Sequence, residues 1–527
     1  MKRILLYRDN PQKQNFTLSE PSLPKEDRVS SQVSPHIEEN LEKVKKIFSA
    51  DINGDVVIRE FFICLKGVGA RAFIVCVDGL TSSSSINDFV LKPLMNSSHS
   101  PYPSIEKAIE YALVPQIQMS TSEDICSSLD SVNIGNAVLF AEGAGVCFVL
   151  DVKSWEHRGI SNPENEAVIQ GPHEGFNEVL RCNTALIRKS LGTANLIMEN
   201  VSLGKTSKTP GAVAYLKNVT NDSLVKEVKR RINSIDAEYV LSSLDVEQYI
   251  EEDTFLPVPQ MITTERPDRV CKALTEGRVA LVLNGSSHVL IMPATCFDLV
   301  TSAEDGYLRY PYSLLIRFLR YVAVVLALLL PGVFAAILNF HPELLLTNIL
   351  LAISSSRALV PYGALVELLI METAFELIKE AGIRIPGPIG STLGIVGGLI
   401  VGQAAVEANL VSPIMIIIVA VTGIASFTVP SYSLSFAFRF SRFLYIFAGA
   451  FAGLYGVVAV LFVNTLLAFG TKSFGVPFMS PLSPTDGRNL LSVVFGSPIW
   501  RRGTVRERYL RPKDMFKKSH ISRKWKE

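Results

Sequence analysis

The chain has 527 residues, a formal net charge of +1 and a mean hydropathy of +0.28, with 51 basic and 50 acidic residues. Such a high mean hydropathy in a chain with so many charges requires charged and apolar residues to be segregated along the sequence. Residues 1–310 carry mixed charge, residues 311–480 are mostly apolar, and residues 481–527 are strongly basic. This excludes a wholly water-soluble protein, a disordered chain and a collagen-like chain, and the near-zero net charge gives no reason to expect nucleic acid as a partner.

The N-terminal region is expected to stay in the cytoplasm. The apolar stretch after Met1 is only four residues long, whereas a signal peptide needs about seven or more. The seven cysteines form no CxxC pair and most lie inside apolar runs. Both features are typical of buried thiols in a reducing compartment.

Residues 1–35 are rich in Pro, Ser, Gln and charge, which predicts a flexible N-terminal segment. Residues 36–160 are expected to form a first soluble α+β subdomain. Apolar residues at helical spacing predict helices at 37–48, 86–95 and 104–113. Pairs of apolar runs around Gly-bearing turns predict β-hairpins at 56–65 with 70–77 and at 137–141 with 146–152.

Residues 165–305 are expected to form a second soluble α+β subdomain. Its predicted helices cover 176–191 and 222–235. Its predicted strands cover 196–201, 212–216, 279–283 and 288–292. The last two strands flank Asn284-Gly285, one of the strongest short hairpin signals.

Residues 311–480 predict an α-helical transmembrane bundle. Four segments are each about long enough to span a bilayer core of roughly 20 helical residues: 314–338, 391–408, 411–429 and 444–467. Pro331-Gly332 predicts a kink in the first of them. Two further segments are ambiguous, because 344–353 is short and 358–378 carries three glutamates.

The basic tail decides the expected topology. From Asp486 onward it holds twelve Lys or Arg against four acids, so it should stay cytoplasmic and contact anionic membrane lipid rather than nucleic acid. With both ends inside, the number of spans is even. We therefore take four spans and leave the two ambiguous segments in-plane, re-entrant or buried, although Arg439 and Arg442 would then face outward, against the charge rule.

Two sets of residues within the membrane region are candidates for function. Gly394, Gly398 and Gly402 recur every fourth position and predict a close helix–helix seam within or between subunits. Glu367, Glu372, Glu376 and Gln403 are candidate pore or polar membrane residues, because carboxylates at bilayer depth are costly and usually face water or a partner. The alternative for the glutamates is an amphipathic helix at the membrane surface with solvated carboxylates. The polar run Gly423–Ser433 is either a broken helix that lines a cavity or an ordinary helix exit.

No catalytic motif, metal-ligand spacing or cofactor fingerprint is present in the sequence, so we expect neither an enzyme nor a cofactor. Asp268, before a helical stretch, is expected to be a cap or a first-turn acid.

Several unlinked motifs, in order over roughly residues 36–485, resemble the A subunit of the GerA-type spore germinant receptors of endospore-forming bacteria. In the soluble region the likeness rests on Gly171-Pro172, Glu174-Gly175-Phe176, Asn183-Thr184, Pro259–Arg269 with Thr264-Glu265-Arg266-Pro267-Asp268, and Glu276–Ala280. In the membrane region it rests on 380–390, 394–398, 402–405, 411–414, 424–428, Pro430-Ser431-Tyr432 and Lys472–Pro477.

The resemblance implies a multi-pass protein of the spore inner membrane that works with a permease-like B subunit and a lipoprotein C subunit. It implies a homo-oligomer of A subunits that contributes an ion-conducting pore coupled to nutrient sensing. A non-conducting scaffold, or an accessory subunit of the dipicolinate-release machinery, stays open as an alternative. A membrane-tethered enzyme lacks a nucleophile–base motif, and a secondary transporter lacks evident inverted repeats.

Overall fold

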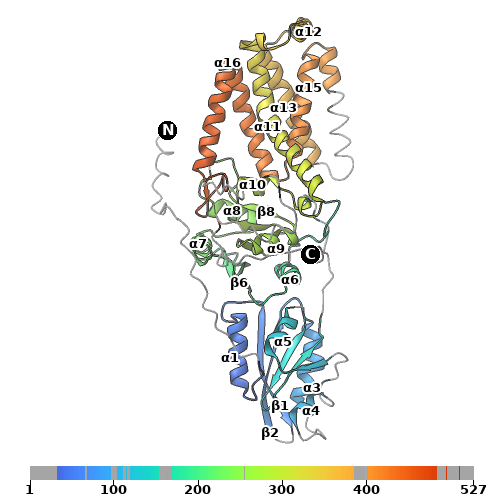
Figure 1. Cartoon of the computed structure of the whole chain (residues 1–527), viewed down its shortest axis with the longest axis vertical. Coiled ribbons are helices and arrows are strands. Elements are labelled where there is room, and N and C mark those ends of the chain that lie inside the picture. Colours follow the sequence, from blue (N-terminus) through green and yellow to red (C-terminus); the bar gives the residue numbers. More distant parts are fainter. Residues whose placement is uncertain are drawn as a thin grey trace, which may run out of the picture.

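The computed structural model describes residues 32–65, 68–96, 104–110, 119–133, 135–153, 168–254, 256–384 and 401–483, together with residues 114, 163, 166, 398, 494, 496 and 510. The described residues form three regions stacked along one long axis: a first α/β unit, a second α/β unit and a helical bundle (Figure 1). Residues 1–31 and most of the tail from 484 onward, predicted as a flexible segment and a cytoplasmic tail, lie outside the described residues.

The first unit is a five-stranded antiparallel sheet, in the order β1-β2-β4-β5-β3, between two layers of helix. One layer holds α1 and α5, and the other holds η1, α3 and α4. The bounds are α1 (Ile37–Phe48), β1 (Val56–Leu65), β2 (Val68–Val77), α2 (Ser83–Ser85), η1 (Ile86–Leu91), α3 (Lys92–Asn96), α4 (Ile105–Ala108), β3 (Met119–Ser122), α5 (Ile125–Val132), β4 (Ala137–Ala141) and β5 (Cys147–Leu150).

The second unit repeats this plan with the order β6-β7-β9-β10-β8. Helices α6 and α9 cover one face of its sheet, and α7 and α8 cover the other. The bounds are α6 (Leu180–Ser190), β6 (Leu196–Leu203), β7 (Thr209–Leu216), α7 (Asp222–Asn233), α8 (Ser243–Ile250), β8 (Ile262–Thr264), α9 (Pro267–Thr275), β9 (Val279–Leu283), β10 (Val289–Met292), α10 (Cys296–Val300) and η3 (Ala303–Gly306).

Each sheet has two buried faces because its central strands contain continuous apolar runs, such as Ala72–Val77 in β2 and Ala212–Ala214 in β7. In β2, Phe73 and Val75 pack under α1 and α5, whereas Ala72 and Ile74 pack under the opposite layer. Successive side chains point to opposite faces of a strand, so a continuous apolar run fills two cores at once. All the hairpins predicted from the sequence are present, and the domain limits themselves stay a prediction.

The two units have the same strand order, and each also contains an equivalent pair of hydrogen bonds before its first helix. In the first unit, Asn40 on the first helix accepts from Ser34 N at 2.9 Å and donates to Ser34 O at 2.6 Å. In the second, Asn183 makes the same two bonds to Asn177 at the same two distances. A buried amide thus closes the same six-residue loop before the first helix of each unit. The fold is therefore an internal duplication, which the sequence analysis did not detect.

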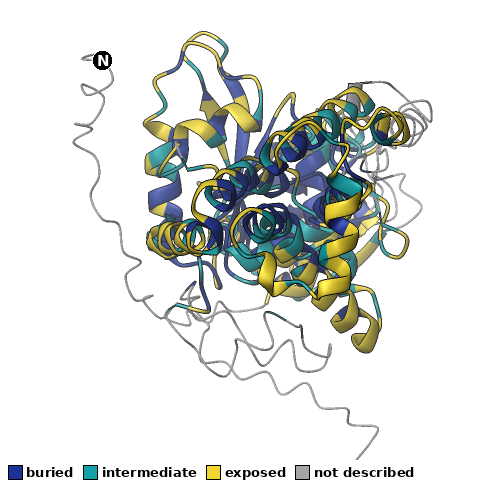
Figure 2. Ribbon diagram, turned by 90° about the horizontal axis from the view of Figure 1, so that it is seen from above, coloured by how far each residue is buried: buried dark blue, intermediate teal, exposed yellow. Residues whose placement is uncertain are grey.

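The bundle consists of long apolar helices and a short cap. Its elements are α11 (Tyr310–Phe340), η4 (Pro342–Leu344), α12 (Thr347–Arg357), α13 (Ala364–Arg384), α15 (Pro413–Phe427) and α16 (Tyr432–Gly470), followed by the short strands β11 (Lys472–Ser473) and β12 (Val476–Pro477). Only α11 and α16 among the described helices are long and apolar enough to cross a membrane on length and composition. Seen end-on, the exposed residues lie mainly on the outer faces of the bundle (Figure 2).

Helix α16 is two antiparallel arms rather than one rod. Gly453 breaks its 39 residues with φ 62° and ψ −151°, a conformation that residues with a Cβ rarely adopt. Asn464 Nδ2 lies 3.0 Å from Tyr445 Oη, whereas 19 residues of straight helix would separate the two by about 28 Å. The first arm therefore runs away from the soluble units and the second arm returns to them. We call the bundle end beside the soluble units proximal and the other end distal.

The fold-back corrects one span prediction. The predicted span 444–467 is wrong, because these residues straddle the turn at Gly453. For the segment 358–378, expected to be in-plane, re-entrant or buried, the structure shows that α13 packs along α15, with Glu367 beside Ser412 at the distal end and Lys379 Nζ 4.3 Å from the Phe427 ring centroid at the proximal end. Helix α11 continues through Pro331.

The closest backbone approach in the bundle lies between α11 and α16. A Cβ added to Gly449 would stand 2.1 Å from the Gly332 carbonyl oxygen, so neither helix tolerates a side chain there. Of the predicted glycine seam, Gly394 lies outside the described residues. A Cβ on Gly398 would meet nothing within 4 Å in the described chain, and one on Gly402 would make only ordinary contact with Ile416. A seam between subunits stays a prediction for these glycines.

Candidate functional site at the base of the bundle

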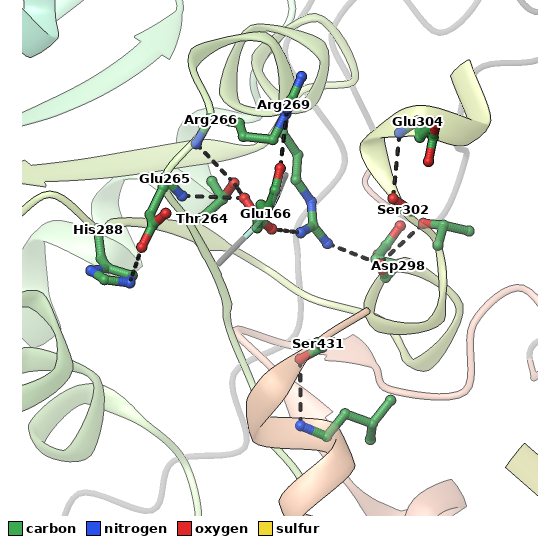
Figure 3. A network of polar contacts seen from close by, with 12 residues as sticks. Glu166, Thr264, Glu265, Arg266, Arg269, His288, Asp298, Ser302, Glu304 and Ser431 are labelled. Atoms are coloured by element: carbon green, nitrogen blue, oxygen red, sulfur yellow. Dashed lines mark hydrogen bonds and ion pairs between the residues drawn. The ribbon is translucent and has the colours of Figure 1, made fainter. Parts of the chain in front are cut away.

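Two motif stretches that are far apart in the sequence meet where the second unit contacts the bundle. The loop before α6, which contains Gly171 and Pro172, packs against the corner where β8 ends and α9 begins. That corner is the Thr264–Asp268 motif, with Pro267 at the first position of α9. Pro has no N–H to leave unpaired at a helix start, so this residue favours an abrupt turn from strand to helix. We call this region the junction cluster. Figure 3 shows the polar contacts of Glu166, Thr264, Arg266 and Arg269 within it.

Arg266 is the centre of the junction cluster and is fully buried. Its Nε and Nη2 bind the two oxygens of Asp268 at 3.0 and 2.8 Å. Its remaining donors bind two backbone carbonyls, Glu166 O at 3.2 Å and Pro172 O at 2.9 Å. One guanidinium therefore ties the helix α9 to the incoming loop, and a planar five-donor group is the side chain suited to this task.

Tyr307 connects this cluster to the first helix of the bundle, three residues before α11 begins. Its hydroxyl donates to Asp268 Oδ2 at 2.5 Å. Its ring lies against Gly171, where an added Cβ would approach ring carbons within 2.8 Å and where φ is +133°. Both the contact and the backbone conformation require glycine at this position. Asp268 is a first-turn acid, as predicted.

The charges around Asp268 set its protonation. Burial raises the pKa of this carboxyl, but hydrogen bonds from Arg266 and Tyr307 outweigh burial and hold the pKa below its usual value. Burial and the bond to Asp268 raise the pKa of Tyr307 to about 12. The cluster is therefore an ionised carboxylate between a guanidinium and a neutral phenol at every physiological pH.

A small cavity of about 130 Å³ opens beside the cluster. Arg269 Nη1 binds Glu166 Oε1 at 2.5 Å, and the other oxygen of Glu166 accepts from the hydroxyl of Thr264. Pro430, from the corner between α15 and α16, lines the same cavity together with Ser302. The cavity thus brings the second unit and the proximal turn of the bundle to one place. Residues 428–431 form the short connection between α15 and α16, so the polar run ends in an ordinary helix exit whose Pro430 lines this cavity.

The second unit holds the bundle at two more points. Asp305 is buried and binds Arg320 Nη1 at 2.8 Å and Arg317 Nε at 3.2 Å on α11. After α16, the β11–β12 hairpin returns and buries Phe474 in the core formed with α7 and α8, with the Arg231 guanidinium 4.3 Å above its ring. The start of α11 and the segment after α16 are therefore both fixed to the second α/β unit.

The other soluble motif residues support the fold around the cluster. Glu174 Oε1 lies 2.6 Å from Lys189 Nζ, Phe176 is buried in the core under α6 and α9, and Asn183 closes the loop described above. Gly175 is buried. Glu265 lies 3.1 Å from His288 Nε2, and its carbonyl accepts from Phe176 N.

Because of the surroundings of Glu247 on α8, we expect the free energy of unfolding to depend on pH. Its carboxyl accepts from Thr263 Oγ1 at 3.4 Å, and burial together with Glu251 raises its pKa to about 7. The unfolded chain ionises near the ordinary value of about 4.3, so the stabilisation from the protonated form is complete below that pH and is lost as the pH rises to 7. We expect the free energy of unfolding to fall by up to about 1.4 kcal/mol per pH unit in this window.

Chemical denaturation at pH 5 and pH 7.5 measures this effect. Glu247→Gln should flatten the pH dependence, and Glu238→Gln, at an exposed site of the same unit, should leave it unchanged. Equal slopes in all three chains would contradict the assignment.

Within the bundle, the predicted acidic residues are paired with arginines. Glu372 Oε2 lies 2.7 Å from Arg442 Nη1, and Glu376 Oε2 lies 2.8 Å from Arg439 Nη1. Glu367 accepts from Ser412 N at 2.6 Å, with Arg357 Nε at 3.4 Å. Glu367 and Glu372 are fully buried, so the alternative of solvated carboxylates at the membrane surface is wrong for these two. Gln403 donates to Glu407 at 2.9 Å near the distal end.

The sequence analysis missed the arginine partners because it counted Arg439 and Arg442 as loop charges. The signal was available: the acids recur every fourth position and the arginines every third, so each set lies on one helix face. It also missed Arg188, which is fully buried where the two units meet and binds both oxygens of Asp55 at 2.8 and 2.9 Å.

Among the described residues no group of three or more His, Cys, Asp or Glu could hold a metal ion. Burial raises the pKa of the Cys271 thiol to about 12 and that of Cys296 to about 11, so neither supplies a thiolate at neutral pH.

Comparison with known proteins identifies the family. Residues 42–508 match the family model described as Bacillus/Clostridium GerA spore germination protein. Spore germination protein B1 of Bacillus subtilis is 36% identical over 470 residues, 89% of this chain and 96% of that protein. Spore germination protein KA of the same species is 35% identical, over 89% of this chain and 86% of that protein.

Two further relatives are a membrane protein and a solved domain. The uncharacterized membrane protein YfkQ of Bacillus subtilis is 37% identical over 90% of this chain and 91% of its own length. The crystal structure of the N-terminal domain of the A subunit of the Bacillus megaterium spore germinant receptor GerK3 is 26% identical, with a TM-score of 0.37, over 50% of this chain and 97% of that domain. The chain belongs to the GerA family of spore germination proteins.

Proposed function

We propose that this chain is a multi-pass membrane subunit of a nutrient germinant receptor, with both termini in the cytoplasm, whose bundle contributes to an oligomeric ion-conducting pore. The observation that carries the proposal is the attachment of the second α/β unit to the start of α11 and to the segment after α16, in a bundle that contains buried charges. A soluble unit fixed in this way transmits a displacement to the bundle helices rather than absorbing it.

The bundle has the features of a bilayer-spanning structure. Exposed tyrosines lie at its two ends: Tyr310, Tyr312 and Tyr432 at the proximal end, and Tyr362 and Tyr455 at the distal end. Tyrosine favours the two membrane–water interfaces. The stretch of α11 between the proximal arginines and Phe340 is about 20 residues, or about 30 Å, which equals the thickness of a bilayer core.

The course of the chain supports cytoplasmic termini. Helix α11 runs outward, α13 and α15 both run toward the soluble units, and the two arms of α16 run outward and back. Since α11 begins and α16 ends at the proximal end, the number of crossings between them is even, as the basic tail also requires.

The proposed partners rest on membership of the GerA family, whose curated relatives are named as spore germination proteins. We infer that the chain assembles with a permease-like B subunit and a lipoprotein C subunit, and with further copies of itself, in the spore inner membrane. In this assembly the partners bind the nutrient and the present chain passes the signal to the ion pathway.

The experiment is performed in spores that lack the gene and carry it back in wild-type or variant form. Loss of the response to one class of nutrient, with the response to others intact, is expected for the deletion. In the complemented spores, Glu376→Gln should change the early release of monovalent cations, whereas the distal control Glu407→Gln should not. Normal cation release in a chain whose soluble units are deleted would contradict both the coupling of these units to the ion pathway and a scaffold that acts through them.

A further inference from the structure

The C-terminal tail returns to the second α/β unit after the bundle ends. Val494 O accepts a hydrogen bond from Tyr321 Oη of α11 at 3.2 Å. Farther along the tail, Leu510 is fully buried in the core under α7 and α8, together with Phe474 and Val476 from the hairpin after α16. This leucine fixes the point on the second unit from which residues 511–527 begin.

Helix α8, which covers this core, carries large apolar side chains on its outer side. Its inward side chains Val246 and Ile250 belong to the same core as Leu510. Four large side chains of α8 and of the loop before it are instead 45–62% exposed: Tyr239, Leu241, Leu244 and Tyr249. We call these four residues the α8 face. A group of exposed apolar side chains on one element is typical of a docking surface.

The charges around the α8 face select its partner. Residues 236–253 include seven acidic residues and no lysine or arginine. Glu238, Asp245 and Asp253 are exposed among them. Acidic residues at the surface repel anionic lipid headgroups and attract a basic peptide. The α8 face therefore fits a partner that is both basic and apolar.

Residues 511–527 have this composition. They contain seven Lys or Arg against two acidic residues, and four large apolar residues lie among the charges: Met515, Phe516, Ile521 and Trp525. The eight residues of α8 span about 12 Å, whereas the seventeen residues after Leu510 reach up to about 56–61 Å. Because this segment begins at a leucine held under α8 itself, its effective concentration at the α8 face is high.

We propose that residues 511–527 dock on the α8 face of the same chain, in place of the anionic lipid that the basic tail alone indicates. The chain that leaves the bundle after α16 is then attached to the second unit at three successive points: the β11–β12 hairpin, Leu510 and the α8 face. The attraction acts between exposed charges, so it weakens as the Debye length falls from about 10 Å at 0.1 M salt to about 3 Å at 1 M. This inference goes beyond the proposed function and does not depend on whether the bundle conducts ions.

Photocrosslinking of the purified full chain in lipid nanodiscs tests the docking. The crosslinker p-benzoylphenylalanine takes the place of Tyr249 on the α8 face or, as a control, of Phe62 on β1, which is 60% exposed in the first unit. Mass spectrometry should find crosslinks to peptides of residues 511–527 from position 249 and not from position 62. The crosslink should be present in neutral phosphatidylcholine and should stay when anionic phosphatidylglycerol is added. It should weaken when the salt concentration is raised.

One exposed site on α8 separates the effect of charge from that of folding. Gln248 is exposed beside Tyr249, so both of its variants should unfold at the wild-type temperature. Gln248→Lys should lower the crosslink yield about threefold and Gln248→Glu should raise it, a modest change because exposed ion pairs are weak. Combining Gln248→Lys with Lys517→Glu and Lys518→Glu should recover the yield, because the signs of both partners are then exchanged.

Three results would overturn the proposal. Equal yields in Gln248→Lys and Gln248→Glu would show that charge does not hold the tail at the α8 face. Loss of the crosslink on addition of phosphatidylglycerol would show that the tail binds lipid instead. In a mixture of unlabelled and ¹⁵N-labelled chains, crosslinks between a labelled and an unlabelled peptide would place the tail on another copy of the chain, whereas crosslinks within one isotope support docking in the same chain.

Discussion

Replacement of Arg266 by methionine is expected to lower the free energy of unfolding by about 3–5 kcal/mol and to abolish the response to nutrient. The substitution keeps the length and apolar volume of the stem but leaves the Asp268 carboxylate, whose side chain is only 15% exposed, without its guanidinium. It also leaves two loop carbonyls, of Glu166 and Pro172, without their donor. The free-energy cost of leaving these groups unpaired exceeds the stabilisation from the one hydrogen bond to Asp268 that is retained, from Tyr307.

Thermal and chemical unfolding of the purified full chain in detergent measure the loss. Lys272→Met is the matched control, because it removes a cation from the same helix α9 at a side chain that is 65% exposed; surface pairs of this kind contribute roughly 0–1 kcal/mol. Arg266→Lys should recover only part of the stability, since an ammonium does not bind Asp268 and both carbonyls in the fork geometry. An equal decrease in the free energy of unfolding for Arg266→Met and Lys272→Met would show that the junction cluster contributes no more to stability than a surface ion pair.

The second large effect is expected at the contact between the two α/β units. Arg188→Met should destabilise the chain by about 3–5 kcal/mol and loosen the first unit from the second. Besides Asp55, the guanidinium binds Asn133 Oδ1 at 3.3 Å and Leu196 O at 3.2 Å. It therefore joins a loop before β1, a loop after α5 and the start of β6, and apolar contact does not replace these bonds.

Small-angle scattering of the full chain should show a larger radius of gyration for Arg188→Met, and unfolding should separate into two transitions. Arg181→Met on the same helix is the control, since its contact to Asp78 is at 3.2 Å and both side chains are about 40% exposed. Combining Arg188→Met with Asp55→Asn should cost far less than the sum of the two single changes, because each removes the same contact. If the two single changes add in the double variant, the contact between Arg188 and Asp55 is not what holds the two units together.

Local pattern predicted the elements of the soluble region well. The hairpins at Val56–Val77 and Val279–Met292 follow from apolar runs around glycine turns, and these signals act between neighbours in the chain. The meeting of Gly171 with Tyr307, 136 positions further along the sequence, follows from the packing of α9 against a loop and has no local signal. Sequence pattern therefore found the motif residues and not their association.

The membrane region was predicted less well for the same reason. Hydropathy identifies the length of an apolar stretch but not the direction in which the chain runs. The apolar residues on the two sides of the break at Gly453 were therefore predicted as one span. Charge statistics treat an arginine at bilayer depth as a loop marker, whereas Arg442 is neutralised by a carboxylate 70 positions earlier. Pairing of opposite charges on separate helices is a tertiary effect that no window along the chain contains.

The repeat of the α/β unit places different side chains at equivalent corners. The corner before α5 and the corner before α9 each follow a strand, and Val33 N and Phe176 N donate to the carbonyls of Glu123 and Glu265 at 2.9 and 2.8 Å. In the first unit the next residue is Asp124, which caps its own helix. In the second unit the matching residue is Arg266, which binds two carbonyls of the loop before α6. The same backbone corner therefore closes one helix start in the first unit and ties a loop to the helix in the second.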